Sequence, residues 1–428
     1  MTKVSQVTGV SDAKVPNRWL IVLAGIVIQL CLGTLYAFSV FRNPLMERFG
    51  WTVTETSLAF TITLVFFTIA MVFAGMWQDK VGPRIVGSVG GIMLGLGCLL
   101  ASRTNSLMML YLSYGVIAGS GVGFAYVTPI ATIVKWFPDK RGLMTGFAVF
   151  GFGAGSLVFA PLAAKLIAGY GVLNTFAILG VIFIVAVTSS AQLLQNPPAG
   201  WKPAEWNPPE PKVKISFRKY DDYTPSEMLR TFRFWVVWAM YFIGAAAGLM
   251  IISQAAPMAE EMVGLTKETA AAAVGILAIF NGVGRLFWGA MSDRIGRNLS
   301  LMLMFSVYAA TLFLVLPNAS TYMVYVAGIC AVALSFGGYL ALMPAITADY
   351  FGTKNLGINY GWMFTAYGAA SLFGPILIAK IKEVSGGYSQ ALYILAALSM
   401  LGIGLTVINK VAGSRVPQKS LETTPSPQ

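Results

Sequence analysis

Long apolar runs, separated by short polar stretches, occupy almost the whole chain. Each run is about 20 residues long, which is the length that crosses the hydrocarbon core of a bilayer as an α-helix. Twelve such runs cover residues 19–41, 53–77, 84–102, 107–134, 143–165, 171–194, 234–256, 268–291, 299–317, 321–348, 357–379 and 387–409. The pattern predicts an all-α membrane protein with twelve transmembrane helices.

One long polar stretch, residues 195–233, divides these runs into two groups of six. Its richness in Pro and Lys is typical of a linker. We therefore expect an N-terminal half over residues 1–194 and a C-terminal half over residues 234–414. The tail, residues 415–428, is rich in Pro, Ser and Thr and is expected to be disordered. The polar start of the chain lacks the features of a cleaved signal peptide, so the first run is expected to remain as a span.

The two halves repeat one another in sequence. Residues 75–84 (GMWQDKVGPR) match residues 289–297 (GAMSDRIGR), which places Asp79 and Asp293 214 residues apart. Further matches, such as Pro129 with Pro344, occur at nearly the same offset. A duplicated six-helix unit predicts two pseudo-symmetric halves, and parallel repeats with a site at their interface are a transporter design.

Charge supports this topology. The chain is 57% hydrophobic and 11% charged, whereas soluble proteins carry about a quarter charged residues. With both termini in the cytoplasm, the cytoplasmic segments hold 21 Lys and Arg and the opposite side holds 7, as the positive-inside rule requires. The net charge of +12 is thereby explained without a nucleic-acid partner. We expect a multi-pass monomer in the plasma (inner) membrane, in contact with membrane lipid.

Several chemistries are disfavoured. Histidine is absent, and the three cysteines, Cys31, Cys98 and Cys330, lie inside apolar runs, so we expect no metal, cofactor or disulfide. An intramembrane enzyme needs a positioned acid, base or metal, and no Asp or Glu lies well inside a run. We therefore expect no enzyme. An anion receptor that signals through the linker stays open as an alternative.

Arg285 is the charged residue that stands well inside an apolar run. A cation at such a depth costs roughly 2.5–3.5 kcal/mol on insertion scales, and charges there are functional by default. A guanidinium binds a carboxylate through two parallel hydrogen bonds, so its partner is expected to be a soluble anion. The alternative is a guanidinium satisfied by helix carbonyls or a lipid headgroup. Asn281 lies one turn earlier on the same face, where it would orient the guanidinium or donate to a substrate oxygen.

Other candidates surround this charge or lie in the repeated loops. Tyr36, Tyr126, Tyr339 and Tyr367 place hydroxyl groups inside the runs, where a substrate carboxylate would supply a partner. Ordinary helix packing is the alternative for each of them. In the repeated loops, Asp79, Arg84, Asp293 and Arg297 are expected to cap helices or to form ion pairs that gate the transporter.

Over essentially its whole length the sequence resembles the major facilitator superfamily, and more narrowly its oxalate:formate antiporter and bacterial monocarboxylate transporter group. The resemblance rests on the two repeated loops and on Asn43-Pro44, residues 135–142 (KWFPDKRG), residues 226–235 (SEMLRTFRFW) and residues 280–289 (FNGVGRLFWG). It implies that Arg285 binds the carboxylate and that Tyr36, Tyr126, Phe336 and Phe364 line a central cavity. Leu35, beside Tyr36, is included with them.

Two departures from the group refine the expectation. The oxalate antiporter has a lysine where this chain has Tyr367, and a single cation suits a monoanion such as lactate or pyruvate. Animal monocarboxylate transporters have an aspartate where this chain has Asn281. Proton symport is their usual mode, and here the proton would enter with the weak acid itself. The resemblance thus implies alternating access with proton-coupled symport of a monocarboxylate, with exchange of dicarboxylate for monocarboxylate anions as the alternative.

Overall fold

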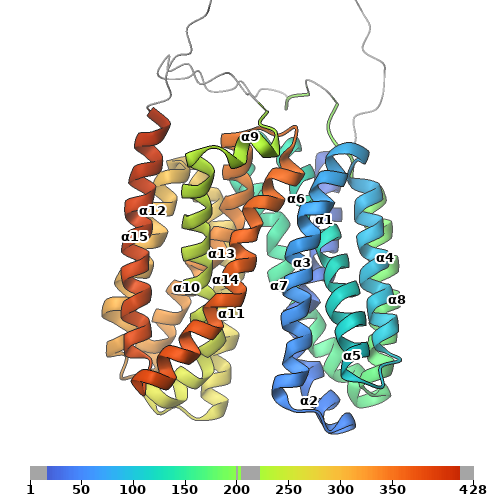
Figure 1. Ribbon diagram of the computed structural model, residues 1–428, viewed down its shortest axis with the longest axis vertical. Coiled ribbons are helices and arrows are strands. Elements are labelled where there is room, and N and C mark those ends of the chain that lie inside the picture. Colours follow the sequence, from blue (N-terminus) through green and yellow to red (C-terminus); the bar gives the residue numbers. More distant parts are fainter. Residues whose placement is uncertain (1–16, 199–200, 204–221, 415–428) are drawn as a thin grey trace, which may run out of the picture.

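The computed structural model describes residues 17–198, 201–203 and 222–414, and every regular element in these ranges is helical (Figure 1). Most of the polar start and the expected disordered tail, residues 415–428, lie outside the described residues. The elements before the linker are α1 (Arg18–Leu32), η1 (Gly33–Ala37), α2 (Phe38–Phe49), α3 (Val53–Val81), α4 (Pro83–Ala101), α5 (Leu107–Leu110), η2 (Tyr111–Ala118), α6 (Gly119–Trp136), α7 (Arg141–Tyr170) and α8 (Val172–Leu193).

The later elements follow the same plan. They are α9 (Pro225–Leu229), α10 (Phe232–Val263), α11 (Lys267–Ile295), α12 (Arg297–Ala310), η3 (Thr311–Val315), η4 (Leu316–Asn318), α13 (Tyr322–Phe351), α14 (Leu356–Ser385) and α15 (Ser389–Ser414). Among the described residues, eleven helical segments are long and apolar enough to cross a membrane, and α14 completes the set of twelve. The predicted all-α, twelve-helix fold is confirmed.

Several helices run beyond the apolar runs that predicted them. α3, for example, continues through Asp79 to Val81, because a helix keeps its own hydrogen bonds after it leaves hydrocarbon. It ends at Gly82, whose φ of 87° belongs to a conformation that favours glycine. α11 ends in the same way at Gly296, with a φ of 90°. The repeated glycines of the two loops are therefore helix stops.

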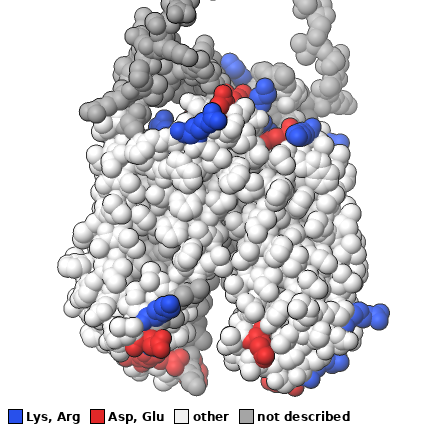
Figure 2. Space-filling view, viewed as in Figure 1, with Lys and Arg blue, Asp and Glu red and all other residues white. Residues whose placement is uncertain are grey.

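The helices form two bundles with a seam between them (Figure 1). α1 to α8 make one bundle and α10 to α15 make the other, and across the seam α3 packs on α14 while α7 packs on α11. We call the end where α1 begins and α9 lies the linker end, and the opposite end the distal end. Figure 2 shows the bundles joined at the linker end and separated by a deep notch at the distal end. Charged side chains gather at both ends, with an uncharged band between them, as expected of a membrane-spanning surface.

At the linker end the two bundles touch backbone to backbone. A Cβ atom added to Gly75 of α3 would lie 2.2 Å from the carbonyl oxygen of Gly357 in α14. A Cβ atom added to Gly289 of α11 would lie 2.4 Å from the carbonyl oxygen of Gly142 in α7. Only glycine permits approaches this close. The repeat in the sequence is therefore also a repeat in the seam.

Candidate functional site

Arg285 lies at the seam, inside the molecule. It belongs to α11, and its side chain is fully buried. The guanidinium lies against Gly153 of α7, where an added Cβ atom would come within 2.9 Å of the Arg285 Cζ atom. The backbone of α11 also lies close to that of α13. A Cβ atom added to Gly337 of α13 would lie 2.1 Å from the carbonyl oxygen of Asn281 in α11. Glycines on both neighbours thus let α11 carry a large cation into a packed interior.

The guanidinium is only partly satisfied by the protein. Its Nη1 atom donates to the carbonyl oxygen of Val149, across the seam in α7. Its Nε and Nη2 atoms have no hydrogen-bond partner within the described residues, and no carboxylate there lies within ion-pair distance of it. An unpaired buried cation is costly. The two free donors are arranged as a carboxylate would need them.

Aromatic side chains from both bundles surround this cation. The hydroxyl oxygens of Tyr36 and Tyr367 lie 2.9 Å apart and form a hydrogen bond across the seam. Phe364 of α14 stacks on Tyr367 with the ring centroids 4.9 Å apart, and its ring lies 5.4 Å from that of Tyr126 in α6. Arg285 acts electrostatically on the hydroxyls of Tyr36, Tyr126 and Tyr367. The structure therefore brings four of the expected residues together with Arg285.

Four further residues of this cluster were missed from the sequence. The ring of Phe152 lies 5.0 Å from Tyr36, and the ring of Phe67 lies 5.1 Å from Phe364. Tyr241 of α10 and Tyr360 of α14 complete the group, which is listed in full as Tyr36, Phe67, Tyr126, Phe152, Tyr241, Tyr360, Phe364 and Tyr367; we call it the aromatic cluster. For Tyr360 a signal existed, because Tyr360, Phe364 and Tyr367 are spaced along one face of a helix.

Three expected residues lie elsewhere. Leu35 lines an apolar cavity within the first bundle, together with Cys31 and Tyr114. Phe336 packs on α10, where an added Cβ on Gly248 would meet its ring at 2.2 Å. Tyr339 packs inside the second bundle, 5.1 Å from the ring of Phe305. These side chains are buried against helices of their own halves, and their expected role in substrate binding stays a prediction.

Asn281 is half-buried one turn from Arg285. Its side-chain oxygen has no hydrogen-bond partner in the described part of the chain, and no hydrogen bond joins it to the guanidinium there. Its proposed role toward Arg285 or a substrate stays a prediction.

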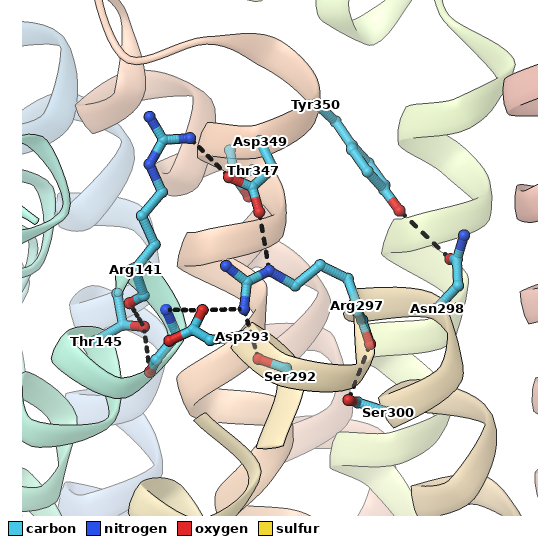
Figure 3. A network of polar contacts seen from close by, with 12 residues as sticks. Arg141, Thr145, Ser292, Asp293, Arg297, Asn298, Ser300, Thr347, Asp349 and Tyr350 are labelled. Atoms are coloured by element: carbon cyan, nitrogen blue, oxygen red, sulfur yellow. Dashed lines mark hydrogen bonds and ion pairs between the residues drawn. The ribbon is translucent and has the colours of Figure 1, made fainter. Parts of the chain in front are cut away.

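The loop aspartate of the second half binds the first half (Figure 3). Asp293 Oδ1 accepts from the backbone N–H of Gly142 at 2.9 Å, and Oδ2 accepts from Leu143 at 2.8 Å. These N–H groups lie in the first turn of α7, where a negative charge is favoured by the helix dipole and by unpaired donors. Asp293 therefore caps a helix of the opposite bundle.

The loop aspartate of the first half does the same in reverse. Asp79 accepts from the N–H groups of Gly357 at 3.2 Å and Ile358 at 3.0 Å, in the first turn of α14. Two pseudo-symmetric caps thus hold the linker end together. We call them the cross-caps.

The two cross-caps are unequal in charge. Arg297 donates to Asp293 and to Asp349, both at 2.8 Å, and Arg141 of α7 reaches Asp349 across the seam at 2.6 Å (Figure 3). In the first half, Lys135 stands 214 residues before Asp349, and its Nζ lies 3.9 Å from Asp79.

Arg84, the counterpart of Arg297, takes no part in its cross-cap. It donates instead to the Leu194 carbonyl at 3.2 Å and to the Gln195 side chain at 2.8 Å. The expected pairing with a loop aspartate therefore holds for Arg297, whereas Arg84 ties α4 to the start of the linker.

The described end of the linker packs on the turn before α14. Asp222 accepts from the N–H groups of Thr353 at 2.9 Å and Lys354 at 2.8 Å, and the Tyr223 carbonyl accepts from Asn355 and Asn359. This turn leads into the helix end that Asp79 caps, so the linker helps to position one cross-cap.

The chemistry available at Arg285 is anion binding. No group of three or more His, Cys, Asp or Glu side chains is arranged to hold a metal in the residues that the structure covers. The aromatic cluster supplies hydroxyl groups and apolar ring faces, and Arg285 supplies the charge. Such a set has the charge and the donors that a small anion needs.

Known proteins are similar to this chain in sequence and in fold. The sequence model of the Major Facilitator Superfamily matches residues 21–283 and 237–427. The oxalate:formate antiporter of Oxalobacter formigenes is 32% identical over 98% of this chain and 97% of its own length. Apicoplast pyruvate carrier 1 of Toxoplasma gondii is 28% identical over 78% of this chain and 72% of its own. A crystal structure of the transporter FucP in the outward conformation shares the fold, with a TM-score of 0.68 at 13% identity over 91% of this chain and 98% of that one.

The unequal cross-caps predict unequal effects of mutation. Asp293→Ala removes the acceptor for two helix N–H groups and for the Arg297 hydrogen bond, whereas Asp79→Ala removes the acceptor for two N–H groups and a longer contact with Lys135. Hydrogen bonds to charged groups contribute about 1.5–3 kcal/mol each, so Asp293→Ala should lower the midpoint of thermal unfolding further than Asp79→Ala. Asp139→Ala is the control, since Asp139 pairs with Arg18 inside the first bundle at 3.4 Å and should cost least. An equal or larger loss for Asp79→Ala would contradict this ranking.

Proposed function

The chain belongs to the major facilitator superfamily, and from that premise we propose that it is a secondary active transporter of a small monocarboxylate such as lactate or pyruvate. The observation that carries this proposal is the buried guanidinium of Arg285, which offers two free donors at the seam between the bundles. A carboxylate bound there would complete the hydrogen bonds of the cation and neutralise it. The oxalate:formate antiporter and the pyruvate carrier among the relatives, both named for carboxylates, support a substrate of this class.

Charge argues for a monoanion. Among the described residues, Arg285 is the one cation in contact with the aromatic cluster, and Tyr367 contributes a neutral hydroxyl there. A dianion such as oxalate would keep one uncompensated charge in a site of low dielectric, which is costly. A short monocarboxylate leaves the site neutral.

The shape supports alternating access. The cross-caps close the linker end, and the notch opens the distal end (Figure 2). We assign the linker end to the cytoplasm and the protein to the plasma (inner) membrane, so this arrangement is an outward-facing state. A substrate shifts the equilibrium between states only if it binds them differently. By neutralising Arg285, the carboxylate lowers the cost of closing the site to water, which favours the transition.

Replacing the central cation tests the site. Arg285→Gln should lower the saturable uptake of lactate and pyruvate by proteoliposomes about 100-fold or more, because two charge-assisted hydrogen bonds are lost. The variant should stay folded, since it removes a buried charge from an otherwise apolar helix.

Arg294→Gln is the matched control for this experiment. Arg294 lies on the same helix with its side chain exposed, so uptake should be retained. Wild-type uptake by Arg285→Gln would contradict the site.

The ion coupled to transport can be identified by changing the pH gradient across the membrane. In proton symport, an acidic exterior should accelerate lactate uptake into vesicles that contain no carboxylate, and a protonophore should abolish the acceleration. The proton then enters with the acid, because Arg285 does not deprotonate. Anion exchange is the alternative, favoured by the antiporter among the relatives. Uptake that needs a preloaded internal anion and ignores the pH gradient would establish exchange and overturn symport.

A second cation should change the preferred charge of the substrate. Tyr367→Lys places an ammonium group beside Arg285 and should shift the preference between oxalate and lactate toward oxalate by about tenfold, which corresponds to roughly 1.4 kcal/mol. Tyr367→Phe, which adds no charge, should leave the preference between mono- and dianions in place. The measurement is competition against labelled lactate uptake. A wild-type protein that prefers oxalate would contradict the monoanion argument.

A further inference from the structure

Two tyrosine hydroxyls of the aromatic cluster are buried without a partner outside the cluster. The side chains of Tyr241 and Tyr360 are fully buried. Among the described residues, the hydroxyls within their reach are each other's and that of Tyr126, and neither donates to a backbone carbonyl or a carboxylate. Tyr308 and Tyr325 of the same bundle use backbone carbonyls: Tyr308 donates to Gly244 at 3.3 Å, and Tyr325 donates to Ala255. Buried polar groups are normally paired, so two neighbouring tyrosines without such an acceptor point to a ligand.

The two hydroxyls belong to the same site as Arg285. The ring of Tyr360 lies 5.9 Å from Phe364, and the ring of Tyr241 lies 6.4 Å from Tyr367. The Tyr360 hydroxyl lies within the field of Arg285 and within hydrogen-bonding reach of the Tyr241 hydroxyl. A molecule held by the guanidinium therefore lies beside Tyr360, and Tyr241 is the next hydroxyl beyond it.

A plain carboxylate does not account for this set of donors. Its two oxygens are taken up by the free Nε and Nη2 donors of Arg285 in the usual paired geometry. Tyr36 and Tyr367 share a hydrogen bond with one another, and Tyr36 also contacts Arg285. Tyr241 and Tyr360 are left to bind a further oxygen on the same small molecule.

We propose that Tyr241 and Tyr360 recognise an oxygen on the carbon next to the substrate carboxylate, so that the protein selects 2-oxo and 2-hydroxy acids over plain acids of the same length. This inference rests on the proposed function and names its substrate class. The C2 oxygen of pyruvate accepts hydrogen bonds, and that of lactate both accepts and donates, and a tyrosine hydroxyl serves either. Propionate has no atom to offer there and leaves both hydroxyls without that partner, which is the strongest way in which a site rejects an analogue.

The test compares three acids of equal carbon number in four forms of the protein. Lactate, pyruvate and propionate compete against uptake of labelled lactate in proteoliposomes, and the half-inhibitory concentrations give apparent affinities. The wild-type protein should bind lactate and pyruvate about tenfold or more tightly than propionate, as expected for loss of neutral hydrogen bonds. Tyr360→Phe and Tyr241→Phe should each weaken lactate and pyruvate and leave propionate unchanged, which also shows that the variants are folded.

Tyr339→Phe is the matched control. Tyr339 is fully buried and its hydroxyl also lacks a partner, but it lies among Phe305 and Tyr308, away from the aromatic cluster. Its removal should leave the ratio of lactate to propionate affinity at the wild-type value.

The failures of the two proposals are distinguishable. If the wild-type protein binds lactate and propionate equally, or if Tyr241→Phe and Tyr360→Phe keep the wild-type ratio, the role of these tyrosines is wrong while the monocarboxylate site stands. If none of the three acids competes, the proposed function itself is overturned.

Discussion

A guanidinium buried at the seam between two helix bundles is the constraint on which the rest of this structure depends. Arg285 donates across the seam to the Val149 carbonyl, and its Nε and Nη2 donors have no hydrogen-bond partner in the described residues. Burying such a charge is tolerated only where something else compensates it. The glycines of α7 and α13 admit Arg285, and the aromatic cluster surrounds it, so an anion is the partner that this buried cation lacks.

The same helices carry both the site and the closure at the linker end. α11 bears Arg285 and, about two turns later, Asp293. α7 bears the Val149 carbonyl that Arg285 binds and the N–H groups that Asp293 caps. α14 likewise carries Tyr360 and Tyr367 as well as the N–H groups capped by Asp79. A change in the contacts of Arg285 therefore acts on the helices whose ends form the cross-caps, and under the proposed function these shared helices are the link between binding and gating.

The sequence predicted the features that a local pattern of residues reveals. Twelve apolar runs and one long polar stretch were enough for the helices, because length and hydropathy decide membrane spans. Arg285 stood out because a charge in an apolar run is rare.

The sequence did not reveal Phe67, Phe152 and Tyr241. Apolar runs in a chain with 27 Phe and 17 Tyr offer no way to tell an aromatic residue of a site from one that only packs in the core. Leu35 lines a cavity of the first bundle, because neighbouring residues of a helix point in different directions. The partners of Asp79 and Asp293 are N–H groups of the opposite bundle, and only the packing of the halves reveals them. Arg84 and Arg297 diverge because Lys135 occupies the place that Asp349 takes in the second half.

The central claim is that Arg285 is the ligand of a substrate carboxylate. The most direct measurement is an experimental structure of the protein determined with lactate or pyruvate bound. The account predicts a carboxylate at the seam, with its two oxygens within hydrogen-bond distance of Nε and Nη2 of Arg285 and with the aromatic cluster around it. A bound acid found elsewhere, with Arg285 held only by protein groups, would contradict it.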